Sequence, residues 1–249
     1  MIEHPFPEVE PDITITPRPD AALTEILRVD LGSGFVPLHV GAETVWSFYD
    51  WPERQLTGVN WTRVVGILKV GGVECLEIID RYREPPIEEA GEWTRGLWRV
   101  SDESLQYLQR EYHDGKGGGM IEEVDATPED LQLRVGDTWI GHEIYRCGSE
   151  ARGEGEVHHG VVEGPFEVAL GAGEMLCLRE TWWSFAADGR GSTMAELYVA
   201  ETGRSVYFRR FNGPAWRNYE QLAGNPEREH DSLIWRLWYE CLPDIALVS

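Results

Sequence analysis

The chain has little positive charge and very little lysine. Of its 249 residues, 22 are Lys or Arg and 44 are Asp or Glu, so the formal net charge is −22, and its lysines are Lys69 and Lys116. A surface this acidic repels phosphate backbones and anionic lipids, and like charge keeps copies apart in solution. We therefore expect no nucleic acid among its partners and no membrane insertion; the oligomeric state stays open.

Long apolar runs and paired cysteines are also missing. No run of 18 apolar residues occurs, so no helix is expected to cross a bilayer. Residues 1–20 hold no apolar segment typical of a signal peptide, which predicts a cytoplasmic location for the sequence as it stands, or an envelope location if a leader has been removed. Four cysteines without a C-x-x-C pair indicate neither a zinc knuckle nor a disulfide scaffold: they are Cys75, Cys147, Cys177 and Cys241.

Strand signals dominate what is present. Residues 1–32 are expected to form an extended, proline-rich arm with a short helix over 21–28, capped by Asp20, and residues 33–249 a single β domain. Residues 232–242 fit a helix and a strand equally well, and their surroundings favour a strand that closes the sheet. Five segments are rich in β-branched, aromatic and aliphatic residues and are separated by glycine turns such as Gly71-Gly72: 64–70, 73–79, 161–168, 175–185 and 205–211.

Three marks recur in the same order at a spacing of about 100 residues. The pair Val40-Gly41, followed by Trp46, returns as Val135-Gly136, followed by Trp139. The segments around Cys75 and Cys177 match, and 97–100 before 105–107 matches 197–199 before 205–207. The sequence thus predicts an all-β fold, a curved antiparallel sheet or half-barrel made of two tandem repeats, 33–120 and 129–249.

These motifs resemble a group of uncharacterised bacterial β proteins. Their pattern, P-L-x-V-G-x-x-W, then a second V-G-x-x-W and an A-G-x-F turn, is matched by 37–41 with Trp46, by 135–139 and by 170–175. Such proteins are distantly similar to the LolA/LppX-like carriers, whose half-barrel holds acyl chains. The resemblance covers about residues 35–215. It implies a curved sheet with an apolar ligand on its concave face.

No motif indicates a particular reaction. The glycine-rich run 115–119 lacks the Ser or Thr of a phosphate-binding loop, and no G-x-S-x-G nucleophile turn occurs. A metal site is not expected, and neither is another cofactor; the alternative is a metal-assisted hydrolase that uses His142, His158 and His159. Adjacent strand residues point to opposite faces, so His158 and His159 cannot chelate one ion together without a bulge.

The 11 tryptophans carry the leading functional hypothesis. Large rings fill cores and line ligand pockets alike, and consecutive Trp182 and Trp183 must face opposite sides of their strand. We expect non-catalytic binding of an apolar or amphipathic small molecule on a concave, aromatic face; the alternatives are the hydrolase and a structural or interaction module. The predicted ligand-binding residues are Trp98, Trp182, Trp183, Tyr198, Tyr207, Trp235 and Trp238.

Overall fold

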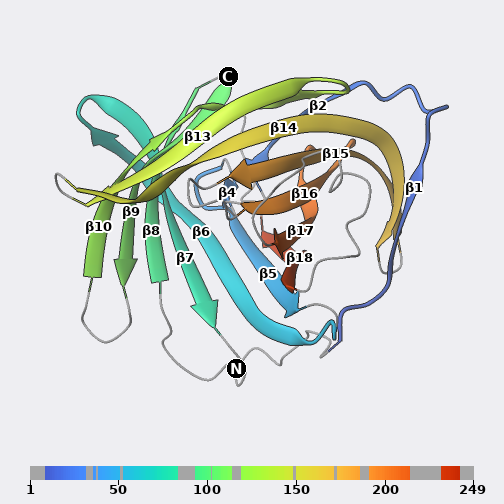
Figure 1. The fold of residues 1–249 in the computed structure, drawn as a ribbon, viewed down its shortest axis with the longest axis horizontal. Coiled ribbons are helices and arrows are strands. Elements are labelled where there is room, and N and C mark those ends of the chain that lie inside the picture. The colour runs from blue at the N-terminus through green and yellow to red at the C-terminus, as the bar shows by residue number, and fades with distance from the viewer. Residues whose placement is uncertain are drawn as a thin grey trace.

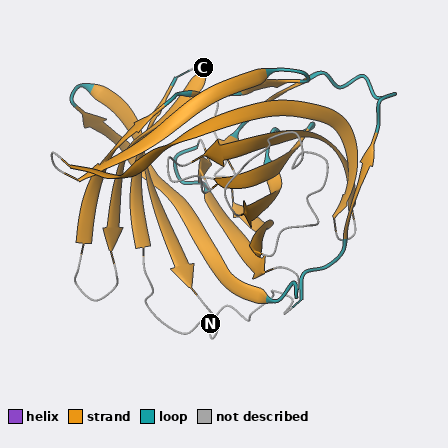
Figure 2. Cartoon of the chain, in the orientation of Figure 1, coloured by secondary structure: helices purple, strands orange, loops and turns teal. Residues whose placement is uncertain are grey.

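The computed structural model describes residues 9–31, 36–37, 39–50, 53–83, 93–101, 103–113, 119–147, 150–170, 173–185, 191–213 and 231–241. For 30–31, 36–37, 83, 150–156, 185, 191–193, 210–213 and 231–241 it describes the backbone alone. Within these ranges every regular element is a strand (Figure 2). The predicted all-β class and the curved antiparallel sheet are confirmed (Figure 1).

Two runs of six long strands make up most of the sheet, and within each run consecutive strands pair antiparallel. The first run comprises β5 (Glu43–Asp50), β6 (Leu56–Val70), β7 (Val73–Arg83), β8 (Trp93–Val100), β9 (Ser104–His113) and β10 (Gly119–Ala126). The second comprises β13 (Thr138–Cys147), β14 (Glu150–Leu170), β15 (Gly173–Phe185), β16 (Gly191–Val199), β17 (Ser205–Gly213) and β18 (Asp231–Cys241).

The two runs join at both ends. β10 pairs with β13, and β18 pairs with β5, so the pairing path passes through all twelve strands and is closed by β14 with β15. The strand predicted over 232–242 is confirmed as far as Cys241. Closure leaves the inner face of the sheet enclosed by strands on several sides.

Six short strands complete the fold. They are β1 (Ile13–Pro17), β2 (Glu25–Leu27), β3 (Asp30–Leu31), β4 (Val36–Pro37), β11 (Glu129–Asp130) and β12 (Gln132–Arg134). β1 pairs with the far end of β14, which arches over the molecule and descends beside it (Figure 1). The arm is therefore part of the sheet system.

Both V-G motifs form the same turn. Gly41 and Gly136 have φ of 83° and 92°, a region that favours glycine. The Gly41 amide donates to the Val64 carbonyl at 2.8 Å, and the Gly136 amide donates to the Val162 carbonyl at 2.9 Å. Each turn stands directly before the first strand of one six-stranded run. The Gly71-Gly72 hairpin is also formed, with φ of 58° and 88°.

The helix predicted over 21–28 is wrong. This segment is extended, and Glu25–Leu27 near its C-terminal end pair with β12. A helix of eight residues is marginal in water by itself, whereas the extended segment gains backbone pairing and buries Ile26 and Arg28. Ile26 and Leu133 pack on Val162 and Leu178, so the β2–β12 ribbon covers part of the inner face.

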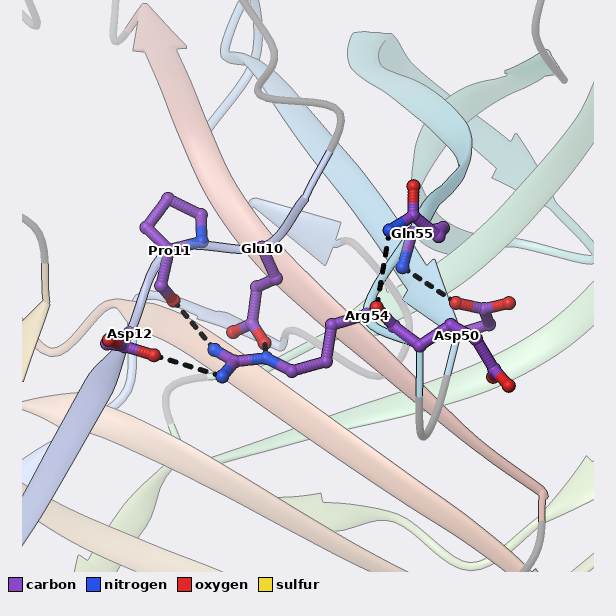
Figure 3. Close-up of polar contacts among 7 residues, drawn as sticks. Glu10, Pro11, Asp12, Asp50, Arg54 and Gln55 are labelled. Carbon is purple, nitrogen blue, oxygen red and sulfur yellow. Dashed lines mark hydrogen bonds and ion pairs between the residues drawn. The ribbon is translucent and has the colours of Figure 1, made fainter.

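Arg54 attaches the start of the arm to the turn between β5 and β6 (Figure 3). Its guanidinium donates to the buried Glu10 carboxylate at 2.9 Å, to Asp12 at 3.0 Å and to the Pro11 carbonyl at 3.0 Å. The Glu10 amide donates in return to the Arg54 carbonyl at 2.9 Å. The arm is thus held by paired charges as well as by strand pairing.

Candidate functional site

A cavity of about 580 Å³ is lined by residues from several strands. Its lining comes from strands β8 to β10 and β13 to β17, from the segment between β10 and β13, and from Arg28 of the arm. This size is typical of pockets for small organic molecules. The described residues of its lining include six aromatic side chains: Trp98, Tyr107, Trp139, Tyr145, Trp182 and Phe208.

The rings form two contacting groups. Trp98 stacks on Tyr107 with centroids 4.2 Å apart, and Tyr107 meets Tyr145 edge-on at 6.5 Å. In the second group, Trp182 lies between Trp139, at 6.5 Å, and Phe208, at 5.7 Å. Offset and edge-on arrangements of this kind are favourable for aromatic quadrupoles, so the rings support one another as well as a ligand.

Gly160 allows Trp139 to lie across β14. The register places Trp139 and Trp182 on either side of Gly160, and a Cβ atom on Gly160 would lie 2.1 Å from the Trp139 ring. The Trp139 indole nitrogen then donates to Glu180 Oε1 at 2.8 Å. A glycine in a strand often marks such a close approach.

Arg28 is the buried cation of the site. Its side chain is 2% exposed; Nη1 donates to Glu180 Oε2 at 2.9 Å, and Nη2 donates to the Asp130 carbonyl. The Tyr198 ring lies 5.6 Å from the guanidinium. Burial would lower the pKa of Arg28, but the negative charges of Glu180 and Glu129 outweigh this effect and raise that pKa. Arg28 therefore stays charged, and Glu180 balances it.

Two further carboxyl groups lie near this pair. Glu129 lines the cavity and lies 3.8 Å from the Arg28 guanidinium, and 43% of its side chain is accessible. Desolvation raises the pKa of Glu129 to about 7, although the nearby Arg28 charge lowers it. Glu196 is fully buried beside the Ser205 and Tyr198 hydroxyls, and burial raises its pKa to about 7. Both groups are thus close to half protonated at neutral pH.

A histidine and a serine also meet in the lining. His158 and Ser184 are direct cross-strand partners on β14 and β15, and His158 Nδ1 lies 2.7 Å from Ser184 Oγ. A hydroxyl that donates to an imidazole is the arrangement by which a serine nucleophile is activated.

The structure brings some of the predicted aromatic residues together and separates others. Trp98 and Trp182 line the cavity. Trp183 is 3% exposed and faces away from Trp182, as strand alternation requires. Tyr198 lies behind the cavity against Arg28, and Tyr207 belongs to a separate core cluster with Tyr49 and Leu197.

Trp235 and Trp238 lie on β18, whose backbone alone is described. By register, Trp235 is opposite Phe48 on β5 and Phe208 on β17. Trp238 lies within the register shift between Leu237 and Tyr239. Their roles in ligand binding stay predictions.

The three predicted metal-binding histidines do not converge. Across the pair β13–β14, His158 is opposite Gly141, whereas His142 is opposite Val157 and His159 is opposite Ile140. His158 therefore projects from one face of the sheet and the other two project from the opposite face. His142 lines the cavity as His158 does, but its side chain is 45% exposed and it bonds to Thr127 at 2.9 Å. Over the described ranges, no three His, Cys, Asp or Glu residues are placed to hold a metal ion.

Sequence reasoning missed Arg28, Glu180 and most of the cavity's rings. Trp139 had a signal, because it ends the second V-G-x-x-W motif. Arg28 had none: it is one of many arginines, and its partner Glu180 is 152 residues away in the chain.

No protein-family profile matches the chain, and no curated protein matches its sequence. Two crystal structures are similar in fold at 10% sequence identity. One is a candidate lipoprotein from Parabacteroides distasonis, with a TM-score of 0.43 over 81% of this chain and 95% of that one. The other is a candidate exported protein with a YmcC-like fold from Bacteroides fragilis, with a TM-score of 0.46 over 81% of this chain and 97% of that one. Among the elements that the structure describes there is no helix of the length and apolarity needed to cross a bilayer.

Proposed function

We propose that this protein binds an apolar or amphipathic small molecule, without catalysis, in the cavity between its strands. The observation that carries the proposal is a space of about 580 Å³ lined by six aromatic side chains. Apolar walls with a few placed polar groups are typical of ligand pockets. Here about half of the described lining residues are polar or charged, and they include the Arg28–Glu180 pair and His158.

The tandem repeat and the likeness to LolA/LppX-like carriers belong to the same proposal. The two V-G turns with equal hydrogen bonding, each before a six-stranded run, support a duplicated unit of about 100 residues. Closing two such units on each other encloses the inner face, which is where a carried molecule would be protected from water.

The first test is native mass spectrometry of the purified protein beside its denatured mass. Excess native mass that an organic extract identifies as an apolar compound would support the proposal and identify the ligand. Titration with Nile red, a neutral apolar dye, extends the test to protein that purifies empty. We expect saturable binding with a rise in dye fluorescence.

Variants separate the cavity from the outer surface. Trp182→Ala should weaken Nile red binding roughly tenfold, because it removes a ring that contacts two others in the lining. Trp93→Ala is the matched control, since Trp93 stacks on His113 outside the cavity, and should leave binding unchanged. Equal effects of both substitutions, or no saturable binding in the parent protein, would refute the proposal.

Hydrolysis is the second candidate function, and the His158–Ser184 contact at 2.7 Å is the observation that favours it. This candidate function predicts that the protein hydrolyses a short-chain nitrophenyl ester. The activity should be insensitive to chelators and should be lost in Ser184→Ala. A rate in Ser184→Ala equal to that of the parent would reject the candidate. Retention of Nile red binding in Ser184→Ala would leave the first proposal intact.

A further inference from the structure

The charged groups in the cavity lining are mostly acidic. Among the described residues of the lining, Arg28 is the one Lys or Arg, and it is already paired with Glu180 at 2.9 Å. Four other lining residues carry carboxyl groups: Glu129, Asp130, Asp137 and Glu143. Among these described lining residues, the charge that remains once Arg28 and Glu180 cancel is negative.

The Arg28–Glu180 pair has little capacity for an anionic ligand. Both Glu180 oxygens accept hydrogen bonds, one from Trp139 and one from Arg28, while the second terminal nitrogen of Arg28 donates to the Asp130 carbonyl. An anion could recruit Arg28 only by leaving Glu180 buried without its cation, which is costly in a low-dielectric interior. The buried arginine therefore acts as a structural pair with Glu180.

The aromatic lining favours positive charge for a second, independent reason. The faces of Trp, Tyr and Phe rings carry negative potential and attract ammonium groups within about 6 Å of the centroid. The first ring group comes from β8, β9 and β13, and the second comes from β13, β15 and β17. Apolar walls, ring faces and surrounding carboxylates together match a molecule with an apolar body and a cationic end.

We infer that the ligand is an amphipathic cation, an alkyl or aromatic body that bears an ammonium group, with Glu129 as its counter-charge. The inference rests on the proposed binding function and specifies its ligand class. Glu129 is suited to this part because its side chain lines the cavity and retains accessible surface there, unlike the fully buried Glu196. Its distance of 3.8 Å from Arg28 leaves it a longer and weaker partner than Glu180.

Protonation of Glu129 should be linked to binding. Its pKa of about 7 results first from desolvation; Glu180, Glu143 and Glu196 raise it and Arg28 lowers it. A cation nearby favours the ionised form, so binding should release a proton, and affinity should increase as the pH rises from about 6 to about 8.

The test uses three probes that share a ten-carbon chain: decyltrimethylammonium, decyl alcohol and decyl sulfate. The two ionic probes are kept below their micelle concentrations, and the alcohol is kept below its solubility limit. Binding to the full chain is measured by titration calorimetry at about pH 8. We expect the cation to bind roughly tenfold more tightly than the sulfate, with the alcohol between them. Sulfate binding as tight as the cation's would overturn the inference, and failure of all three probes to bind would refute the proposed function itself.

A protein with a net charge of −22 attracts any cation. Substitution of Glu129 therefore tests whether cation affinity depends on this carboxylate in the cavity or on the overall charge. Glu129→Gln should reduce cation affinity about fivefold and alter alcohol affinity by less than about twofold. The matched control is Glu174→Gln, which removes the same charge at an exposed position outside the cavity and should change cation affinity by less than about twofold. Equal losses in the two variants would overturn the role of Glu129.

Discussion

At the scale of single residues, Gly160 determines where the Trp139 ring lies. We expect Gly160→Ala to destabilise the protein by about 1–3 kcal/mol, because the added methyl overlaps the ring and breaks its bond to Glu180. Gly66→Ala is the control, since a Cβ there meets nothing within 4 Å, and should change the free energy of unfolding by less than about 0.5 kcal/mol. Urea unfolding measures both. Equal stability of the two variants would contradict this account of Gly160.

Glu196 makes stability depend on pH. Its pKa is raised from 4.5 to about 7 by burial, with Glu180 raising it and Ser205, Tyr198 and Arg28 lowering it. The folded state therefore holds the proton more tightly than the unfolded chain, so this contribution is complete below about pH 4.5 and is lost as the pH rises through about 7. The loss is roughly 3 kcal/mol for this group.

Two other groups act in the same direction, Asp80 and Glu129, each with a pKa raised to about 7 mainly by desolvation. The thermal midpoint should thus be lower at about pH 8 than at about pH 5.5, and Glu196→Gln should reduce that difference. Carboxylates with lowered pKa, such as Glu111, act only in a more acidic range. A pH dependence in Glu196→Gln as steep as in the parent would count against the assignment.

At the scale of elements, the arm is attached to the rest of the molecule at three places. Its strand β1 pairs with β14, its strand β2 pairs with β12, and its Glu10 carboxylate accepts a hydrogen bond from Arg54 in the β5–β6 turn. We expect Arg54→Ala to cost about 1–3 kcal/mol, since it leaves the buried Glu10 carboxylate without its cation.

A matched substitution at a second arginine that pairs with the arm, Arg134 of β12, tests whether burial is the cause. The Arg134–Glu25 pair is more than half exposed on both sides, so Arg134→Ala should cost about 0.5 kcal/mol or less. Urea unfolding compares the two variants. A loss in Arg134→Ala as large as that in Arg54→Ala would show that burial of Glu10 is not what matters.

For the whole molecule, repulsion between its many negative charges opposes closure of the ring of strands. A net charge of −22 repels itself within a compact ring of strands, and salt screens that repulsion. We expect the thermal midpoint to rise between about 20 mM and about 500 mM sodium chloride, where the Debye length falls severalfold. A fall over this range would mean that ion pairs such as Arg28–Glu180 outweigh the general repulsion.

Much of the element content could be predicted from the sequence. Glycine pairs with positive φ, β-branched runs and the strand at the C-terminal end follow from local rules, and the structure agrees at Gly71-Gly72 and β18. Strand alternation also correctly placed Trp182 and Trp183 on opposite faces. These features depend on residues that are close together in the chain, so they can be predicted from the sequence alone.

The tertiary structure decided which residues meet. Register shifts near Leu97 and near Glu143 change the face on which later residues lie, so alternation alone could not assign the cavity's rings. Ring closure brings Arg28 to Glu180, and pairing with β12 makes the expected helix a strand. Composition and turn chemistry set the class of this fold, whereas its site depends on pairings between distant strands, whose free energy is realised only when the sheet closes.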